Sequence, residues 1–427
     1  MWHSPLGHIL VTYSFEGETV MKKGRFRGQS VAVLTAAVAL GSLAAAAPAA
    51  SGATTKGPPR KAPSGLRFYT PKKLPAGAHG TLIWERRLRG VAALTGANNY
   101  LVLYKQVGVR GTQVPVSGIV SIPRGKAPRR GWPVITFAHS TTGIADQCSP
   151  SRDTGLGSGA DEADLGTAAL LDGWIKAGYA VVRTDYEGLG TAGPHPYLIG
   201  RSEGYGVLDI VRAARQLDRA VSDRIVISGH SQGGQAALWA AALAPKYTPD
   251  LRLLGTVAFA PQSHIAQEAS LLRSIASPAL TPLAALILRG ADVAYPSLHI
   301  SSLLSPAGAA LYPQTLTRCL KQLEAPSSFG GLALDQLVSP TANLAPTIAK
   351  LAANDPDNLK IKGPVLLEQG LADTTVLPAF DQALSQELAK NGAQVTYRTY
   401  PGATHGGVLI AAAKDATTFI KRRLGKG

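Results

Sequence analysis

The stretch Arg224–Trp239, RIVISGHSQGGQAALW, decides the fold. Three β-formers, Ile225–Ile227, lead into the pattern G-H-S-Q-G, and an alanine-rich helical segment follows at once. A G-x-S-x-G pattern between strand and helix predicts a sharp, strained turn that lifts the serine hydroxyl above the sheet edge. Glycines are expected at 229 and 233 because side chains there would collide with the neighbouring strand and helix. We therefore predict that Ser231 is a nucleophile held at the apex of this turn.

Strand and helix patterns alternate on both sides of this stretch. Three short β-rich runs, 82–88, 100–107 and 114–122, predict an initial antiparallel meander. The apolar run Val134–Ala138 is typical of a strand buried on both faces, and so is Tyr179–Arg183. Helical spacing is expected over 165–177 and 205–217, a strand over 253–260, then strand 364–369, helix 378–391, strand 394–400 and a closing helix 407–424. The alternation predicts an α/β fold with a mostly parallel central sheet flanked by helices.

The segment from about 264 to 360 has a different pattern. Alanine- and leucine-rich helical pieces alternate there with prolines, and no strong strand is visible. A segment of this length is too long for a simple loop. We therefore predict an inserted helical cap over about 264–360, within a single domain that spans 79–427.

The N-terminal part has the composition of an export signal. A basic stretch after Met21 is followed by the apolar, alanine-rich run Ser30–Ala47 and by small residues suited to cleavage. We predict a signal region over 1–50 with its true start at Met21. A retained anchor is the alternative, and cleavage is favoured because alanine is only weakly apolar. Residues 51–78, rich in Pro, Gly, Lys and Ser, predict a flexible linker.

Charge and cysteine content narrow the function classes. The formal net charge is +16, yet no Lys/Arg run with interleaved aromatic residues is visible, so we predict no nucleic-acid partner. A basic surface is compatible with transient contact with a lipid interface or an anionic cell envelope. Two cysteines in an exported chain, Cys148 and Cys319, predict one disulfide. No metal or other cofactor is predicted, because the acidic residues Asp161, Glu162 and Asp164 lack a regular ligand spacing.

A serine nucleophile needs a base within hydrogen-bond reach, and that base needs an orienting acid. In α/β-hydrolases the chain order is Ser, then Asp or Glu, then His. Three histidines follow Ser231, namely His264, His299 and His405. His405 lies in GATHGG, between the last predicted strand and the last predicted helix, whereas His299 falls within the predicted cap. We predict His405 as the base.

The acid is expected where the preceding strand ends. Asp373 follows the predicted strand 364–369 within QGLADTTVLP, which is the expected place. Glu368 and Asp381 are the alternatives, and alternation places Glu368 inside the strand while Asp381 falls on the following helix. We predict Asp373 as the acid.

The sequence HSTTG at 139–143 directly follows the buried strand that ends at Ala138. In α/β-hydrolases the loop after that strand donates a backbone N–H to the oxyanion. We predict an oxyanion hole formed by the amides of Gln232 and of Thr141 or Ser140. His139 is expected to brace this loop. Bracing roles are also expected for Asp185 and Glu187, and a place beside the pocket for His195.

Taken together, these motifs resemble the secretory lipase family of α/β-hydrolases, from about residue 82 to the C-terminus. The resemblance rests on HSTTG at 139–143, DYEGLG at 185–190, GHSQGG at 229–234, QGLADTTVLP at 369–378 and GATHGG at 402–407. It implies an exported lipase or esterase with catalytic Ser231, Asp373 and His405, acting on carboxylic-ester or lipid substrates. One departure is Ser140, where such loops usually carry glycine after the histidine.

Two alternatives remain open at this point. The same fold supports a serine peptidase or an acyltransferase, although no set of residues suited to holding a peptide terminus is visible. A non-catalytic binding module built on the same fold is the other alternative, and the complete Ser, Asp and His set argues against it.

Overall fold

The computed structural model describes residues 62–155, 165–270, 274 and 276–425. The predicted signal region 1–50 lies outside the described residues, and so do the first part of the predicted linker and the acidic residues Asp161, Glu162 and Asp164.

Within the described residues, one nine-stranded sheet forms the centre of the domain, with the strand order β1-β2-β3-β5-β4-β6-β7-β8-β9. The strands are β1 (Leu82–Arg87), β2 (Ala97–Val107), β3 (Gln113–Pro123), β4 (Trp132–Ala138), β5 (Ala180–Thr184), β6 (Val221–His230), β7 (Arg252–Phe259), β8 (Pro364–Gly370) and β9 (Gln394–Tyr400). The first three strands pair antiparallel, as does β3 with β5, and every pair from β5-β4 to β8-β9 is parallel. The predicted meander and the mostly parallel sheet are confirmed.

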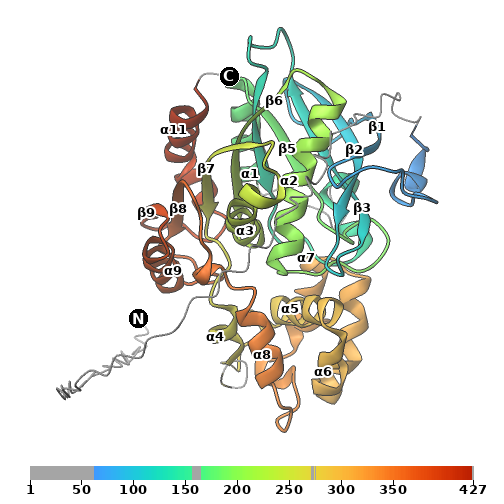
Figure 1. Ribbon diagram of the computed structural model, residues 1–427. Coiled ribbons are helices and arrows are strands. Elements are labelled where there is room, and N and C mark those ends of the chain that lie inside the picture. The colour runs from blue at the N-terminus through green and yellow to red at the C-terminus, as the bar shows by residue number, and fades with distance from the viewer. Residues whose placement is uncertain (1–61, 156–164, 271–273, 275, 426–427) are drawn as a thin grey trace, which may run out of the picture. The chain divides into compact units, whose positions relative to one another are not determined.

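Helices cover both faces of this sheet (Figure 1). They are α1 (Leu165–Lys176), α2 (Gly200–Leu217), α3 (Gln232–Tyr247), α9 (Pro378–Lys390), α10 (Val408–Ala411) and α11 (Ala413–Leu424). Apolar residues of α2, α3 and α9 pack into one cluster with the sheet, and those of α1, α10 and α11 pack into another on its other side. The central strands β4 and β5 are therefore buried along their whole length, which explains their mostly apolar sequences.

The chain between β7 and β8 forms a separate helical layer, drawn in yellow and orange in Figure 1. Its helices are α4 (Ile265–Ser270), α5 (Thr281–Ala294), α6 (Pro306–Leu311), α7 (Leu320–Leu323) and α8 (Ala345–Ala352). Prolines occupy the first turns of α5, α6 and α8, where a missing backbone N–H costs no helical hydrogen bond. This layer, which we call the cap, has its own apolar cluster, with Leu286, Phe329 and Leu337 fully buried.

Short 3-10 turns complete the described secondary structure. They are η1 (Gly65–Tyr69), η2 (Asp146–Cys148), η3 (Pro150–Arg152), η5 (Pro296–Leu298), η6 (Ile300–Leu303), η7 (Tyr312–Leu316), η8 (Phe329–Gly331), η9 (Leu334–Gln336) and η10 (Pro356–Asn358).

The structure differs from the sequence-based expectations in two segments. The described part of the predicted linker, from residue 62 to 78, packs on the domain, because Phe68 and Tyr69 are buried against Ile83, Leu101 and neighbouring apolar residues. The closing helix predicted over 407–424 is two helices, α10 and α11, that meet at residue 412. The prediction of a linker was wrong for residues 62–78, because their mostly polar composition gave no sign that Phe68 and Tyr69 would be buried.

The predicted disulfide is confirmed. Cys148 and Cys319 are bonded, with their Cα atoms 5.4 Å apart and 171 residues between them in sequence. The bond joins η2, in the loop region after β4, to the start of α7 in the cap. The backbone amide of Leu320 also donates to the carbonyl oxygen of Thr142, at 2.9 Å, so the cap is fixed to this loop at two points. None of the helices in the described part is both long and apolar enough to cross a membrane.

Candidate active site

The turn between β6 and α3 holds Ser231 in a strained conformation. Its backbone has φ 57° and ψ −119°, a region that residues other than glycine rarely adopt. Such strain costs about 1–3 kcal/mol and persists only where the surroundings enforce it. The Ser231 amide donates to the Phe259 carbonyl at 2.9 Å, and the Ser231 carbonyl accepts from the amides of Gln235 and Gln262, both at 3.1 Å. These bonds from β7, α3 and the chain beyond β7 hold the turn in place.

The two glycines of the turn are sterically required. A Cβ added at Gly233 would lie 2.0 Å from the carbonyl oxygen of Ala138, and one added at Gly229 would lie 2.1 Å from that of Gly233. Real Cβ atoms do not approach backbone oxygens this closely, so α3 reaches the end of β4 only because position 233 has no side chain.

The structure brings Asp373 and His405 together. Asp373 Oδ2 lies 2.7 Å from Nδ1 of His405, and its Oδ1 accepts from the amides of Thr375 and Val376 at 2.8 and 2.9 Å. Burial alone would raise the pKa of Asp373, but the hydrogen bond and charge of His405, with the two amides, lower it below its ordinary value. An ionised carboxylate only accepts, so Nδ1 of His405 carries the hydrogen and Nε2 is left as the acceptor.

The alternative acids and bases occupy other surroundings. Glu368 is buried inside β8 and accepts from the Tyr400 hydroxyl at 3.0 Å, and burial raises its pKa to about 8. Asp381, in α9, is fully buried, and neither of its carboxyl oxygens has a hydrogen-bond partner in the described part of the chain. His264 lies 3.3 Å from Glu387 and stacks on Phe380. His299 is exposed, in the cap between η5 and η6.

Ser231 and His405 are not hydrogen-bonded to each other through their side chains in the described structure. Catalytic hydrogen bonds are often loose before substrate binds, so the bond between these two side chains is expected to form in the substrate complex. His230, the neighbour of Ser231, contacts the loop of His405 instead. Its Nε2 donates to the His405 carbonyl oxygen at 2.9 Å, and the two ring centroids are 4.6 Å apart.

The loop after β4 and the start of α3 hold the predicted oxyanion-hole residues. Gln232 is the first residue of α3, so its amide has no acceptor within the helix. Thr141 and Ser231 line the same cavity. The Ser140 carbonyl accepts from Nδ1 of His139 at 2.6 Å, and the Tyr186 hydroxyl donates to the His139 carbonyl at 2.9 Å. These bonds brace the loop, as expected of His139.

The remaining acidic and histidine residues of this region lie behind the turn rather than in the cavity. Asp185 accepts from the Ser117 hydroxyl at 2.6 Å, and Glu187 accepts from the Val109 amide at 2.8 Å, so both brace loops as expected. His195 is fully buried, with Nδ1 2.8 Å from the Glu187 carbonyl and Nε2 2.9 Å from the side-chain nitrogen of Gln232. It therefore supports the Gln232 side chain and does not line the cavity.

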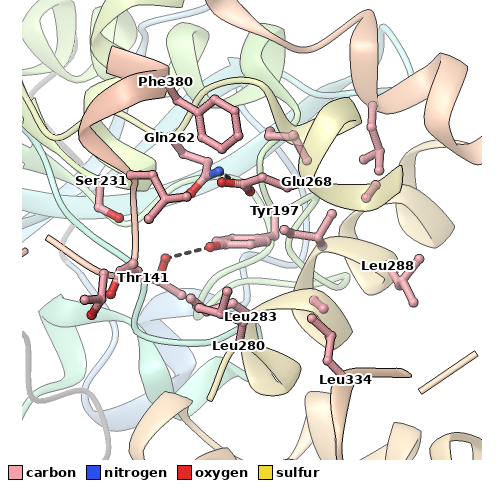
Figure 2. Close-up of a pocket in the computed structure, with 18 residues that line it drawn as sticks. Thr141, Tyr197, Ser231, Gln262, Glu268, Leu280, Leu283, Leu288, Leu334 and Phe380 are labelled. Atoms are coloured by element: carbon pink, nitrogen blue, oxygen red, sulfur yellow. Dashed lines mark hydrogen bonds between the residues drawn. The ribbon is translucent and has the colours of Figure 1, made fainter. Parts of the chain in front are cut away.

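A cavity of about 150 Å³ lies between Ser231 and the cap (Figure 2). It is lined by Thr141, Tyr197, Ser231, Gln262, Ile265, Glu268, Ala269, Leu280, Leu283, Ala284, Ile287, Leu288, Leu334, Leu351, Thr374, Thr375, Leu377 and Phe380. Half of these residues are apolar and come from the cap. The polar ones gather near Ser231, where the Tyr197 and Thr141 hydroxyls are 2.7 Å apart. This arrangement suits a mostly apolar group attached to an atom that reacts at Ser231.

Sequence reasoning did not predict several polar residues of this cavity, among them Gln262, Tyr197 and Glu268. Gln262 follows the carboxyl end of β7, and that position in a parallel sheet is a signal that could have found it. Tyr197 precedes α2, and Glu268 lies on the first cap helix. Neither residue lies in a sequence pattern that points to the cavity. Glu268 reaches the cavity only through the packing of the cap. Among the described residues, no group of His, Cys, Asp and Glu side chains has the arrangement of a metal site.

The sequence pattern of the secretory lipase family matches residues 166–426. The chain belongs to the secretory lipase family. Proteins with related sequences include Lipase A of Moesziomyces aphidis, 29% identical over 44% of this chain and 41% of that protein. A secreted triacylglycerol lipase of Malassezia globosa is 24% identical over 84% of this chain and 78% of its own length. A probable inactive lipase of Mycobacterium tuberculosis is 27% identical over 69% of this chain and 67% of its own length. The chain thus spans about two fifths of the first relative.

Solved structures of lipases and esterases share the fold. Candida antarctica lipase A in its closed state superposes with a TM-score of 0.71 at 24% identity, covering 86% of each chain. The rice cell wall degrading esterase LipA of Xanthomonas oryzae gives a TM-score of 0.65 at 20% identity, over 82% of this chain and 99% of that one. The predicted α/β-hydrolase fold with an inserted helical cap is confirmed.

Proposed function

We propose that this member of the secretory lipase family is an exported serine hydrolase that cleaves carboxylic esters of lipase or esterase type. The single observation that carries the proposal is the hydrogen bond of 2.7 Å between Asp373 and His405, at the sheet edge where the strained Ser231 opens into an apolar cavity. Ester or lipid molecules are the proposed substrates, and no cofactor is needed for this chemistry.

The proposed reaction begins with proton transfer. Nε2 of His405 takes the proton from the Ser231 hydroxyl while Oγ of Ser231 bonds to the ester carbonyl carbon. The electron pair of the carbonyl double bond moves onto the carbonyl oxygen. The oxyanion accepts hydrogen bonds from the amides of Gln232 and of Thr141 or Ser140. Asp373 holds the tautomer of His405 and stabilises its positive charge. Collapse of the tetrahedral intermediate breaks the bond to the alcohol, which leaves with the proton from His405, and water then releases the acyl group by the same steps.

A non-catalytic binding module is the second candidate, favoured by the relative from Mycobacterium tuberculosis that is named a probable inactive lipase. Against it stands the retention here of Ser231, Asp373 and His405, with the last two in hydrogen-bond contact. Serine peptidase and acyltransferase activities use the same residues and are distinguished by substrate.

Fluorophosphonate labelling tests the catalytic proposal directly. The secreted chain is expected to take one label on Ser231 and to hydrolyse p-nitrophenyl esters, whereas Ser231→Ala is expected to lose both properties and keep its melting temperature. An amide panel and an acyl-acceptor panel run beside the esters identify a peptidase or an acyltransferase. A folded wild-type chain that neither takes the label nor cleaves an ester would refute the proposal and favour the binding module.

Export is tested on the same material. We propose that Met21 starts a signal that is removed near residue 50, and that the basic chain contacts lipid or envelope surfaces only transiently. N-terminal sequencing of the protein from the culture medium is expected to find a start close to residue 50. Retention in the membrane fraction with an intact N-terminus would favour the anchor instead.

A further inference from the structure

Gln262 and Glu268 form a hydrogen-bonded pair in the wall of the cavity next to Ser231. The Gln262 side-chain nitrogen donates to Oε2 of Glu268 at 2.7 Å (Figure 2). The backbone amide of Gln262 also donates to the Ser231 carbonyl at 3.1 Å. The pair is therefore fixed to the turn that carries the nucleophile, while the surrounding cap side chains, such as Leu283, are apolar.

The helix that carries Glu268 is fixed as well. Asp355 accepts from the amides of Ile265 and Ala266 at the start of α4, at 2.7 and 3.3 Å. Since Glu268 lies one turn further along the same short helix, these bonds set its position relative to the cavity. Its side chain points toward Gln262 in Figure 2.

The hydrogen-bond pattern places the proton of Glu268. A side-chain amide nitrogen only donates, so Oε2 must be an acceptor. Burial raises the pKa of Glu268 to about 8; the hydrogen bond from Gln262 acts in the opposite direction, and the nearby charge of Asp355 adds to the rise. The carboxyl is therefore expected to hold a proton at neutral pH, and because Oε2 accepts from Gln262, Oε1 is the oxygen expected to carry it. This oxygen has no hydrogen-bond partner in the described part of the chain.

Glu268 is half-buried, so the cost arises when an acyl chain covers Oε1. A hydrocarbon chain would then leave this donor without a partner, which costs free energy in an apolar cavity. In the proposed reaction the acyl group stays bonded to Ser231, which lines this cavity, after the alcohol has left. We propose that the cavity selects esters whose acyl chain carries an oxygen acceptor, which receives a hydrogen bond from Oε1 of Glu268; this inference rests on the proposed ester hydrolysis. The acceptor is an ether, hydroxyl or second ester oxygen within an otherwise apolar chain.

Matched acyl chains test this selection. The probes are p-nitrophenyl hexanoate and its 3-, 4- and 5-methoxy derivatives, because a methoxy oxygen accepts a hydrogen bond and cannot donate one. Wild type is expected to favour at least one methoxy position over the plain chain by about tenfold or more in kcat/KM. The ratio of the two kcat/KM values is the readout, because the steps at Ser231, His405 and Asp373 are common to both esters.

Two variants and one control assign the ratio to the donor. Glu268→Leu is expected to bring the ratio close to one, whereas Glu268→Gln is expected to retain it, because an amide still donates. Glu324→Gln, at an exposed glutamate elsewhere in the cap, is expected to leave both rates and their ratio as in wild type. Melting curves establish that each variant is folded.

The pH dependence of the ratio is an independent readout. Between about pH 7 and 9 the wild-type ratio is expected to fall, because the Glu268 carboxylate cannot donate, whereas the Glu268→Gln ratio is expected to stay constant. The ionisable groups around Glu268 are Asp355, Asp381, Tyr197 and His264, and they are the same in both proteins. A ratio that falls equally in both proteins would assign the effect to one of those groups and overturn the inference.

Two further results would overturn it. They are a wild type that cleaves the plain ester with no methoxy preference and a Glu268→Leu variant that keeps the preference. Each of these leaves ester hydrolysis intact, so it removes this inference alone. Absence of any ester turnover would remove the proposed function together with it.

Discussion

The Nε2 atom of His230 lies 2.9 Å from the carbonyl oxygen of His405. His230 precedes the predicted nucleophile, and His405 is the predicted base, so one hydrogen bond connects the β6 turn to the loop after β9. Burial lowers the pKa of His230 to about 3, which keeps its ring neutral. A carbonyl oxygen only accepts, so His230 is the donor in this bond, and it positions the loop rather than acting on substrate.

Removing this donor is expected to slow the reaction without weakening substrate binding. For His230→Ala we expect kcat to fall by about 10- to 100-fold with KM nearly unchanged, because a small displacement of the base is costly. His230→Gln retains a donor and is expected to recover much of the rate. Steady-state kinetics on a p-nitrophenyl ester measure both. Equal rates in wild type and His230→Ala would show that this bond does not position His405.

Asp373→Asn is expected to lower kcat by about 10⁴-fold, because an amide no longer fixes the tautomer of His405. Asp381→Asn is the matched control, since this carboxyl is also buried nearby but makes no hydrogen bond to His405. It is expected to leave kcat within a few-fold of wild type. Loss of activity in Asp381→Asn with retention in Asp373→Asn would reverse the assignment of the acid. Fluorophosphonate labelling rates provide a second measure.

Glu368→Gln is expected to stabilise the fold at neutral and alkaline pH. Burial raises the pKa of Glu368 from 4.5 to about 8, so the folded state holds a proton that the unfolded chain has lost. The free energy of unfolding therefore falls as pH rises from about 4.5 to 8, on the order of 3 kcal/mol from this group by about pH 7. Denaturant unfolding at several pH values measures the difference. A wild-type to variant difference that is independent of pH would contradict the expectation.

Gly233→Ala is expected to destabilise the fold severely and abolish activity. Its Cβ would lie 2.0 Å from the Ala138 carbonyl oxygen, so either β4 or α3 must move. Gly173→Ala in α1 is the control, because a Cβ there meets no atom within 4 Å. That change is expected to stabilise the protein by about 0.5–1 kcal/mol through helix propensity. Thermal melts and ester turnover report on both, and a stable, active Gly233→Ala protein would disprove the steric requirement.

Much of the sheet and the positions of Ser231, Asp373 and His405 could be predicted from the sequence. Each of these residues follows a strand with a clear pattern, and the carboxyl ends of parallel strands meet at one edge of a sheet. Local sequence patterns gave a wrong prediction where contacts between distant segments decide which residues are buried. Phe68 and Tyr69 lie in a segment whose polar composition predicted a linker, yet both are buried.

The sequence by itself determined the strand, sharp turn and helix around Ser231, because the glycines at 229 and 233 and the flanking periodicity act over a few residues. The place of Asp373 after a strand also indicated it as the acid, whereas only the tertiary structure decided the surroundings of the other carboxyls and which carboxyl enters the cavity. Asp373, Asp381 and Glu368 are all acidic residues within 14 positions of one another, but one contacts a histidine and the other two are buried elsewhere. Segments far apart in the chain decide which side chains are buried and which come into contact. Gln262, for example, bonds both to Glu268 and to the turn of Ser231, and no local sequence pattern encodes these contacts.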